Sequence, residues 1–205
     1  MTSPQLQQAF DAFDARNAED PKHTVVDGNA IPNELLYAQR MSAMLQRYRP
    51  DASEVLQLAA RCQHICRWSI ARDSYPMTKP GYHQWRNALK AMHAQLASNI
   101  LRDVGYDDIT IQRVAQLVGK AAPLSDPDMQ TLEDVIVLVF VEDYLQAFVE
   151  QHPDYDTPKL LDILRKTLRK TSPQGREAAL TIIRLPDALV PAITQVMQEE
   201  GWLPA

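Results

Sequence analysis

The sequence has no long hydrophobic run, and this absence excludes proteins that cross a bilayer as a helix. The longest uninterrupted apolar stretch, Val135–Val141, has seven residues, whereas a transmembrane helix needs about 20. The N-terminus is polar and has neither the basic nor the apolar segment of a secretory signal. We therefore expect a soluble, cytoplasmic protein with no membrane partner.

Cysteine is scarce as well. The two cysteines, Cys62 and Cys66, lie four residues apart on what we predict to be one helix. Neighbours at this spacing cannot easily form a disulfide within a regular helix, and two thiols alone are poor evidence for zinc. We expect both to be reduced and buried, which suits a cytosolic protein.

Glycine is equally sparse, and the six glycines form no known motif. The chain has neither GxxxxGK nor GxGxxG, so no phosphate-binding loop is predicted. It also lacks a nucleophile elbow and the HExxH helix of zinc proteases. Any chemistry must therefore come from side chains that project from other elements.

The charge is modest in sum but uneven in distribution. A net charge of −5 makes nucleic acid an unlikely partner. Residues 61–102 nevertheless carry seven Arg and Lys against one acid, and residues 159–176 carry six against one. Such segregation can focus an anion onto one region. Two solvated helix faces would explain the same pattern.

Apolar residues recur with the helical period along almost the whole chain, which predicts an all-α bundle of about eight or nine helices. The expected helices span residues 4–16, 32–49, 51–70, 82–104, 107–120, 127–150, 158–170, 173–183 and 186–200. Residues 23–31 are expected to form a loop or turn, because they contain Asp27-Gly28-Asn29. We expect a single helical domain over residues 1–205, with its core at about 30–150 and the C-terminal helices, 157–200, packed on it.

The run Val135–Val141 is the one segment that propensity assigns to a strand, because it contains many β-branched residues. The helical period continues on both sides of it, through Leu132 and Leu145, and no partner strand is evident. We therefore predict a central helix that is apolar on all sides.

Three places in these helices could carry chemistry. Glu142 follows the apolar run and shares its stripe, where a buried carboxylate must be paired, protonated or bound to a cation. His93 lies at the edge of an apolar helix face, where a satisfied core histidine is the alternative. Gln63 borders the apolar face of its helix, whereas His64 falls on the other side and is expected to be exposed if it has no function.

Five segments resemble a known family. These are NELLYAQRMS (33–42), LAARCQHICRW (58–68), GYHQWR (81–86), HAQLASNIL (93–101) and LEDVIVLVFVEDY (132–144). They closely resemble a family of small bacterial and fungal proteins that is known only as a domain of unknown function, DUF4202. The resemblance covers residues from roughly 10 to 180 and implies no activity.

The same segments are similar, more distantly, to the HD-type metal-dependent phosphohydrolases, in which four ligands on bundle helices hold a divalent metal. Gln63 and His64 stand where that family has its His-Asp pair, and His93 takes the place of a later histidine. Glu142 or Asp143 replaces the last aspartate. Tyr37 stands where the first histidine is expected, with Glu34 one turn earlier.

The resemblance thus implies an HD-domain-like bundle with an altered ligand set. A mononuclear Zn, Mn or Fe site is chemically reasonable, because imidazole and carboxylate suit these metals and a bound metal activates water. The metal ligands would be His64, His93, Glu142 and Glu34, and the catalytic groups would be Gln63, His64, His93 and Glu142. The residues expected to bind the substrate are Arg61, Arg67, Trp68, Trp85, Arg86, Lys166 and Lys170, although both tryptophans have plain packing as an alternative.

Two functions follow from this set. The first is metal-dependent hydrolysis of a phosphorylated or otherwise anionic small molecule, whose phosphate oxygens arginine binds in a bidentate manner. The alternative is a non-catalytic helical protein that binds an anionic ligand or an acidic partner.

Metal analysis of the purified protein tests the first function. We expect stoichiometric divalent metal that disappears in the His93→Ala and Glu142→Ala variants, because each variant removes a ligand. Metal-free protein in which Glu142 bonds only to protein groups would contradict it.

Overall fold

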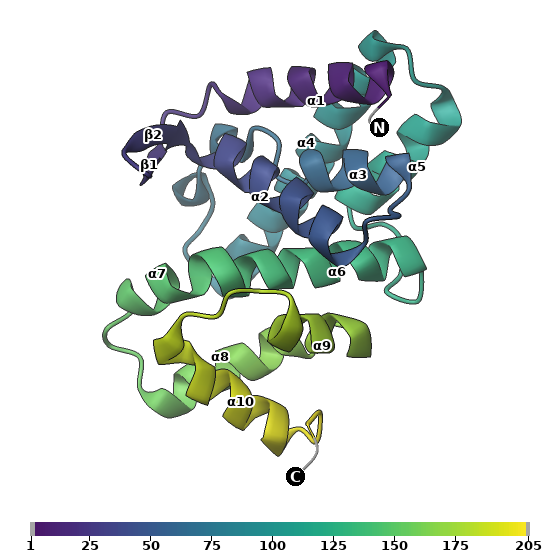
Figure 1. Cartoon of the computed structure of the whole chain (residues 1–205). Coiled ribbons are helices and arrows are strands. Elements are labelled where there is room, and N and C mark those ends of the chain that lie inside the picture. Colours follow the sequence, from purple (N-terminus) through teal and green to yellow (C-terminus); the bar gives the residue numbers. More distant parts are fainter. Residues whose placement is uncertain (1–2, 204–205) are drawn as a thin grey trace. The chain divides into compact units, whose positions relative to one another are not determined.

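The computed structural model describes residues 3–203 and confirms that the chain is predominantly α-helical, with ten α-helices among these residues (Figure 1). The chain forms two compact units that divide between Met129 and Gln130. The expectation of one domain over residues 1–205 stays a prediction.

The first unit contains five helices and a small hairpin. The elements are α1 (Pro4–Asn17), β1 (His23–Val26), β2 (Asn29–Pro32), α2 (Asn33–Tyr48), α3 (Glu54–Arg61), α4 (Lys79–Val104) and α5 (Asp108–Val118). The long helix α4 packs along α5, and α3 packs against α2 and α5. Fully buried Phe13, Met41, Leu58, Leu89 and Leu117 supply one side chain from each helix to the core.

The segment expected as a loop or turn, residues 23–31, is a two-stranded antiparallel hairpin. Val26 pairs with Asn29, so Asp27 and Gly28 form a two-residue turn, with φ angles of 49° and 80°. Positive φ at both positions is what a type I′ hairpin turn requires, and Asp-Gly is a favoured sequence for it. The Asp-Gly signal was therefore present in the sequence, although the flanking strands are only four residues each.

The predicted helix over residues 51–70 is wrong in its second half. Helix α3 ends at Arg61, and residues 62–66 form a series of turns before a short 3-10 helix at Arg67–Ser69. Cys66 adopts a left-handed conformation with φ 53°, which is unfavourable for a residue with a Cβ. Cys62 and Cys66 are buried and unpaired, as expected, but they do not share a helix.

A tertiary hydrogen bond holds this turn in place. The side-chain Oδ1 of Asn17, at the end of α1, accepts the backbone N–H of Cys66 at 3.0 Å. Asn17 is 1% exposed, so the bond forms away from water. One turn earlier on α1, both carboxylate oxygens of Asp14 accept the guanidinium of Arg61. Helical periodicity continues past Arg61 in the sequence, but these contacts with α1 stop the helix there.

The second unit is helical throughout its regular structure. Its elements are α6 (Pro127–Val139), which runs through the division, a π-helical turn (Phe140–Tyr144), α7 (Leu145–Glu150), α8 (Thr157–Leu168), α9 (Pro173–Thr181) and α10 (Val190–Glu199). The apolar run Val135–Val141 is helical, so the choice of helix over strand is confirmed. The predicted helix at 127–150 contains one π-helical interruption that sequence periodicity did not reveal.

A buried carboxylate fixes the start of α9 in the second unit. Asp134 is 1% exposed. Its Oδ1 accepts the backbone N–H of Ser172 at 2.8 Å and the amide of Gln130 at 2.9 Å. Its Oδ2 accepts the Ser172 hydroxyl at 2.6 Å, and that hydroxyl in turn accepts the N–H of Gly175. A Cβ at Gly175 would come within 2.7 Å of Asp134, so glycine allows this close approach.

We expect Asp134→Ala to lower the free energy of unfolding of the full chain by about 2–3 kcal/mol, because buried donors that bond to a charged acceptor lose their partner. Urea denaturation measures the change. The control is Asp154→Ala at an exposed position, for which we expect a change within about 0.5 kcal/mol. Equal stability of the two variants would contradict the role given to Asp134.

Candidate functional site

Glu34, Tyr37, Arg67 and His93 contact His64 or act on its charge, and Gln63 precedes it in the chain. We call these five residues, together with His64, the His64 cluster. They come from α2, from the turns after α3 and from α4. The Nδ1 of His64 lies 3.8 Å from an oxygen of Glu34, and the ring of Tyr37 stacks on His64 with 4.2 Å between centroids. The ring of His93 is 5.9 Å away.

His93 is held in one orientation. It is 3% exposed, and its Nδ1 lies 2.8 Å from the carbonyl oxygen of Ile65. A carbonyl can only accept, so we assign the proton to Nδ1, which leaves the lone pair of Nε2 unused by this contact. Burial lowers the pKa of His93 to about 4, assisted by the charges of Arg67 and Arg86, although the bond to Ile65 acts in the opposite direction. The imidazole is therefore neutral at neutral pH.

His64 is neutral as well. Burial lowers its pKa well below the ordinary value, and the positive charge of Arg67 acts in the same direction. The contact with Glu34 would be an ion pair only if His64 were protonated. Because desolvation and Arg67 both disfavour the imidazolium, we interpret the 3.8 Å contact as one between a neutral imidazole and a carboxyl group.

The pKa of Glu34 is shifted in the opposite direction, upward. Burial raises its pKa to about 7, Arg67 lowers it in part, and Asp20 raises it. A carboxyl group with this pKa exchanges its proton near neutral pH, as a general acid or base does.

Asp20 is a residue that sequence reasoning missed. It is 3% exposed, and its carboxylate accepts the backbone N–H groups of Lys22 and Glu34, each at 3.0 Å. These bonds close the base of the β1–β2 hairpin and fix the first turn of α2, where Glu34 lies. Only the hairpin brings positions 20 and 34 together, and no local sequence signal reveals their contact.

Arg67 supplies the charge of the cluster. Its guanidinium lies 5.3 Å from the centroid of Trp85, and the indole N–H of Trp85 donates to the carbonyl of Ile70 at 2.9 Å. The Nε of Arg67 and the Oε1 of Gln63 are both buried and have no hydrogen-bond partner among residues 3–203. Buried polar groups without partners are rare in native proteins and call for an explanation. Here a donor of Arg67, whose charge acts on Glu34, His64 and His93, and an acceptor of Gln63 are both unmatched.

The cluster fits a divalent metal in the type of its donors but not in their number. Imidazole and carboxylate suit Zn, Mn or Fe, and the bond from His93 to a carbonyl is typical of an oriented metal ligand. Within the described part of the chain, however, no three His, Cys, Asp or Glu side chains are placed to hold a metal together. The metal stays a prediction, and the mechanism proposed below does not depend on it.

Glu142 does not occupy the buried position that the sequence predicted. It lies in the π-helical turn of the second unit and is partly exposed, whereas its neighbour Val141 is fully buried. A π-helical turn has more residues than an α-helical one. The period of 3.6 residues that the sequence prediction used therefore does not hold across this turn, where Val141 is buried and Glu142 is partly exposed. Lys166 and Lys170 also belong to the second unit, whereas the His64 cluster is described within the first unit alone.

The predicted substrate-binding residues of the first unit separate into different roles. Arg67 is in the cluster, and the charge of Arg86 acts on the pKa of both histidines. Arg61 is bonded to Asp14. Trp85 is 8% exposed and packs under Arg67. This position favours a packing role for Trp85 over stacking on a substrate. Trp68 is partly exposed in the 3-10 turn.

In the second basic window, residues 159–176, Arg165, Lys166 and Arg169 pair with acids. Lys166 binds Asp162 within α8 at 2.6 Å, whereas Arg165 and Arg169 bind Glu199 and Glu200 at the end of α10, at 2.5 and 2.8 Å. The acids of α10 lie some thirty residues away along the chain, so the local charge count did not reveal them. Arg165 and Arg169 thus connect the end of α8 to the end of α10.

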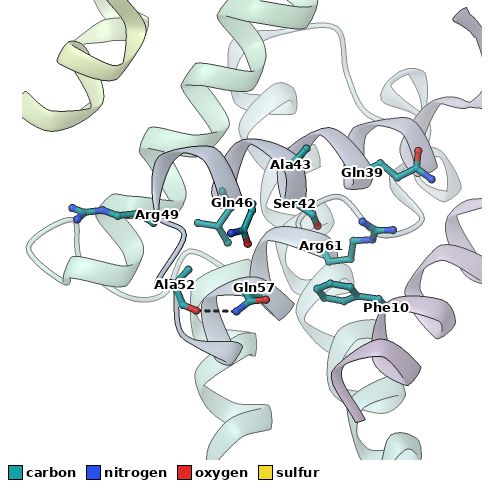
Figure 2. A pocket seen from close by; sticks show the side chains of 10 residues that line it. Phe10, Gln39, Ser42, Ala43, Gln46, Arg49, Ala52, Gln57 and Arg61 are labelled. Atoms are coloured by element: carbon teal, nitrogen blue, oxygen red, sulfur yellow. Dashed lines mark hydrogen bonds between the residues drawn. The ribbon is translucent and has the colours of Figure 1, made fainter. Parts of the chain in front are cut away.

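A separate pocket of about 330 Å³ lies among α1, α2 and α3 (Figure 2). Phe10, Gln39, Ser42, Gln46, Gln57 and Arg61 are among its lining residues. None of the six side chains of the His64 cluster lines it.

These features define a helical protein in which two neutral imidazoles, a carboxyl group and an arginine lie together in one largely buried cluster. Among known families, the model of DUF4202, a domain of unknown function, matches residues 7–193. The chain therefore belongs to the DUF4202 family. No curated protein and no solved structure matches it significantly, so the resemblance to HD-type phosphohydrolases stays a prediction. No helix in residues 3–203 has the length and apolarity needed to cross a membrane.

The raised pKa of Glu34 makes a prediction about stability. A glutamic acid whose pKa is higher in the folded than in the unfolded state stabilises the fold at low pH. This stabilisation is lost as the pH rises from 4.5, the pKa of the unfolded state, to about 7, the pKa of the folded state. We therefore expect Glu34→Gln to gain stability relative to the wild type across this interval. Urea denaturation at several pH values measures the difference.

Glu177→Gln, at an exposed position of α9, controls for the loss of one surface carboxylate. If both variants change equally relative to the wild type across the interval, the protonation assigned to Glu34 is wrong.

Proposed function

We propose that this chain hydrolyses a small phosphorylated or otherwise anionic molecule at the His64 cluster. The observation that carries the proposal is the buried Nε of Arg67, which has no partner among the described residues and lies in a group with two neutral imidazoles and a carboxyl group of pKa about 7. A fixed cation supports binding of the anion, and the titratable groups support transfer of a proton.

Arg67 is suited to the recognition step. A guanidinium donates to two oxygens of a phosphate or carboxylate at once. Trp85 underlies the guanidinium and is itself fixed by Ile70, so the orientation of Arg67 is set before a ligand binds. The Oε1 of Gln63 is an acceptor for a hydroxyl group of the same ligand.

Glu34 is suited to the proton transfers. In its ionised form it takes a proton from the attacking water as the water oxygen bonds to phosphorus. In its protonated form it gives that proton to the leaving-group oxygen as the scissile P–O bond breaks. Asp20 fixes the backbone of Glu34, and the Nε2 lone pair of His93 accepts a hydrogen bond from the bound water or ligand.

A second candidate is ligand binding without turnover. The low pKa of His93, about 4, makes its imidazole a weak base at neutral pH. The unmatched groups of Arg67 and Gln63 require only a ligand, so a binding protein would satisfy them equally well.

Replacement of Arg67 tests the anion site. We expect Arg67→Gln to weaken binding of inorganic phosphate by about 10- to 100-fold, the effect of losing charge-assisted hydrogen bonds. Calorimetry measures the affinity, and hydrolysis of p-nitrophenyl phosphate, with and without added Zn, Mn or Fe, measures turnover. Arg102→Gln, at an exposed position of α4, is the matched control and should leave both unchanged.

The outcomes separate the candidates. Turnover that falls in Glu34→Gln while phosphate still binds supports the hydrolase. Phosphate binding that depends on Arg67, without turnover under any metal condition, supports the binding protein. If Arg67→Gln and Arg102→Gln bind phosphate equally, the cluster is not the anion site.

A further inference from the structure

The pocket of Figure 2 lies on the other side of α2 from the His64 cluster. Glu34 and Tyr37 contact His64, whereas Gln39, Ser42 and Gln46 line the pocket. At about 100° per residue, these two sets fall on roughly opposite faces of the helix. A ligand in the pocket would therefore not contact the cluster, and the two sites can be tested separately.

The pocket carries little charge of its own. Arg61 is bonded to both carboxylate oxygens of Asp14, and its guanidinium lies 5.1 Å from the ring centroid of Phe10. Arg49 lies at the opposite end, points away from the centre and lies over the ring of Tyr48 (Figure 2). No aspartate or glutamate is among the described lining residues. An ion in the centre would thus meet no unpaired counter-charge.

What the pocket offers is a set of uncharged hydrogen-bonding groups. The hydroxyl of Ser42 is buried and has no partner within residues 3–203. The Gln57 amide donates to the carbonyl of Ala52 at 2.8 Å, which fixes its orientation. Gln46 lines the same pocket, and Figure 2 shows both side chains between Arg49 and Phe10. With Gln39, three carboxamides line one space, and each carries both donors and acceptors.

We propose that this pocket binds an uncharged, hydroxyl-rich small molecule of the size of a monosaccharide or a cyclic polyol. Hydroxyl groups both donate and accept, so they match carboxamides and a serine better than an ion would. A volume of about 330 Å³ is at the low end for ligand pockets, which suits one small ring. Phe10 and Leu45 give the lining apolar surface for the C–H groups of such a ring.

Nuclear magnetic resonance of the full ¹⁵N-labelled chain tests the proposal, with the side-chain amide signals of Gln39 as reporter. D-glucose, D-ribose and myo-inositol are titrated separately to about 10 mM, ten times a Kd of about 1 mM. We expect saturable shifts with at least one of the three. Inorganic phosphate at the same concentration should not shift these signals.

Variants locate the binding. Gln46→Trp fills the pocket from an exposed position and should weaken the affinity at least tenfold, whereas Gln95→Trp, at an exposed position of α4, should not change it. Ser42→Ala should weaken binding several-fold without lowering the midpoint of unfolding, because the Ser42 hydroxyl has no protein partner to lose. Arg67→Gln should leave this binding intact, which separates it from the anion site.

Three results would overturn the proposal. The first is the absence of saturable shifts with all three compounds. The second is binding that Gln46→Trp and Gln95→Trp leave equally strong, which would place it elsewhere on the chain. The third is an equal response to phosphate, which would show that the pocket selects for charge rather than for hydroxyl groups.

Discussion

The site of this protein depends on the hydrogen bond from the backbone N–H of Cys66 to the side chain of Asn17. Cys66 has a left-handed backbone, a conformation that costs a residue with a Cβ about 1–2 kcal/mol. A buried acceptor at 3.0 Å offsets this cost, because the N–H would otherwise be buried without a partner. Without that turn, α3 would continue and His64 would take the exposed side of a helix.

The end of α1 and the loop after it fix three segments in the same way. Asp14 holds Arg61, Asn17 holds the turn at Cys66, and Asp20 holds the first turn of α2 at Glu34. Three polar residues spaced three apart thus set the positions of Glu34, His64 and Arg67 relative to one another. The same packing removes water from the cluster. Desolvation then raises the pKa of Glu34 and lowers the pKa of His64 and His93. Near neutral pH both imidazoles are therefore uncharged and Glu34 is partly protonated, whereas Arg67 keeps its positive charge.

The sequence was sufficient for features that arise from local periodicity. It predicted the all-α fold and the helical state of Val135–Val141, and the DUF4202 resemblance was confirmed. The rings of His64 and His93 lie 5.9 Å apart, but their role in a site stays a prediction. Two of the differences arise from long-range contacts. The end of α3 is set by α1, and Asp20 is brought to Glu34 by the hairpin. Glu142 differs, because it lies in a π-helical turn, where the period of 3.6 residues on which its predicted burial rested does not hold.

The two basic windows show why a charge count is a poor guide to an anion site. In residues 159–176, Arg165 and Arg169 bind the acids at the end of α10, and Lys166 binds Asp162. In residues 61–102, Arg67 keeps a buried Nε without a partner among the described residues. The windows have similar net charge, yet a ligand would have to displace protein carboxylates from Arg165 and Arg169, and it would displace none from the Nε of Arg67. What separates a binding arginine from a structural one is therefore the state of its hydrogen bonds, which depends on residues far away in the sequence.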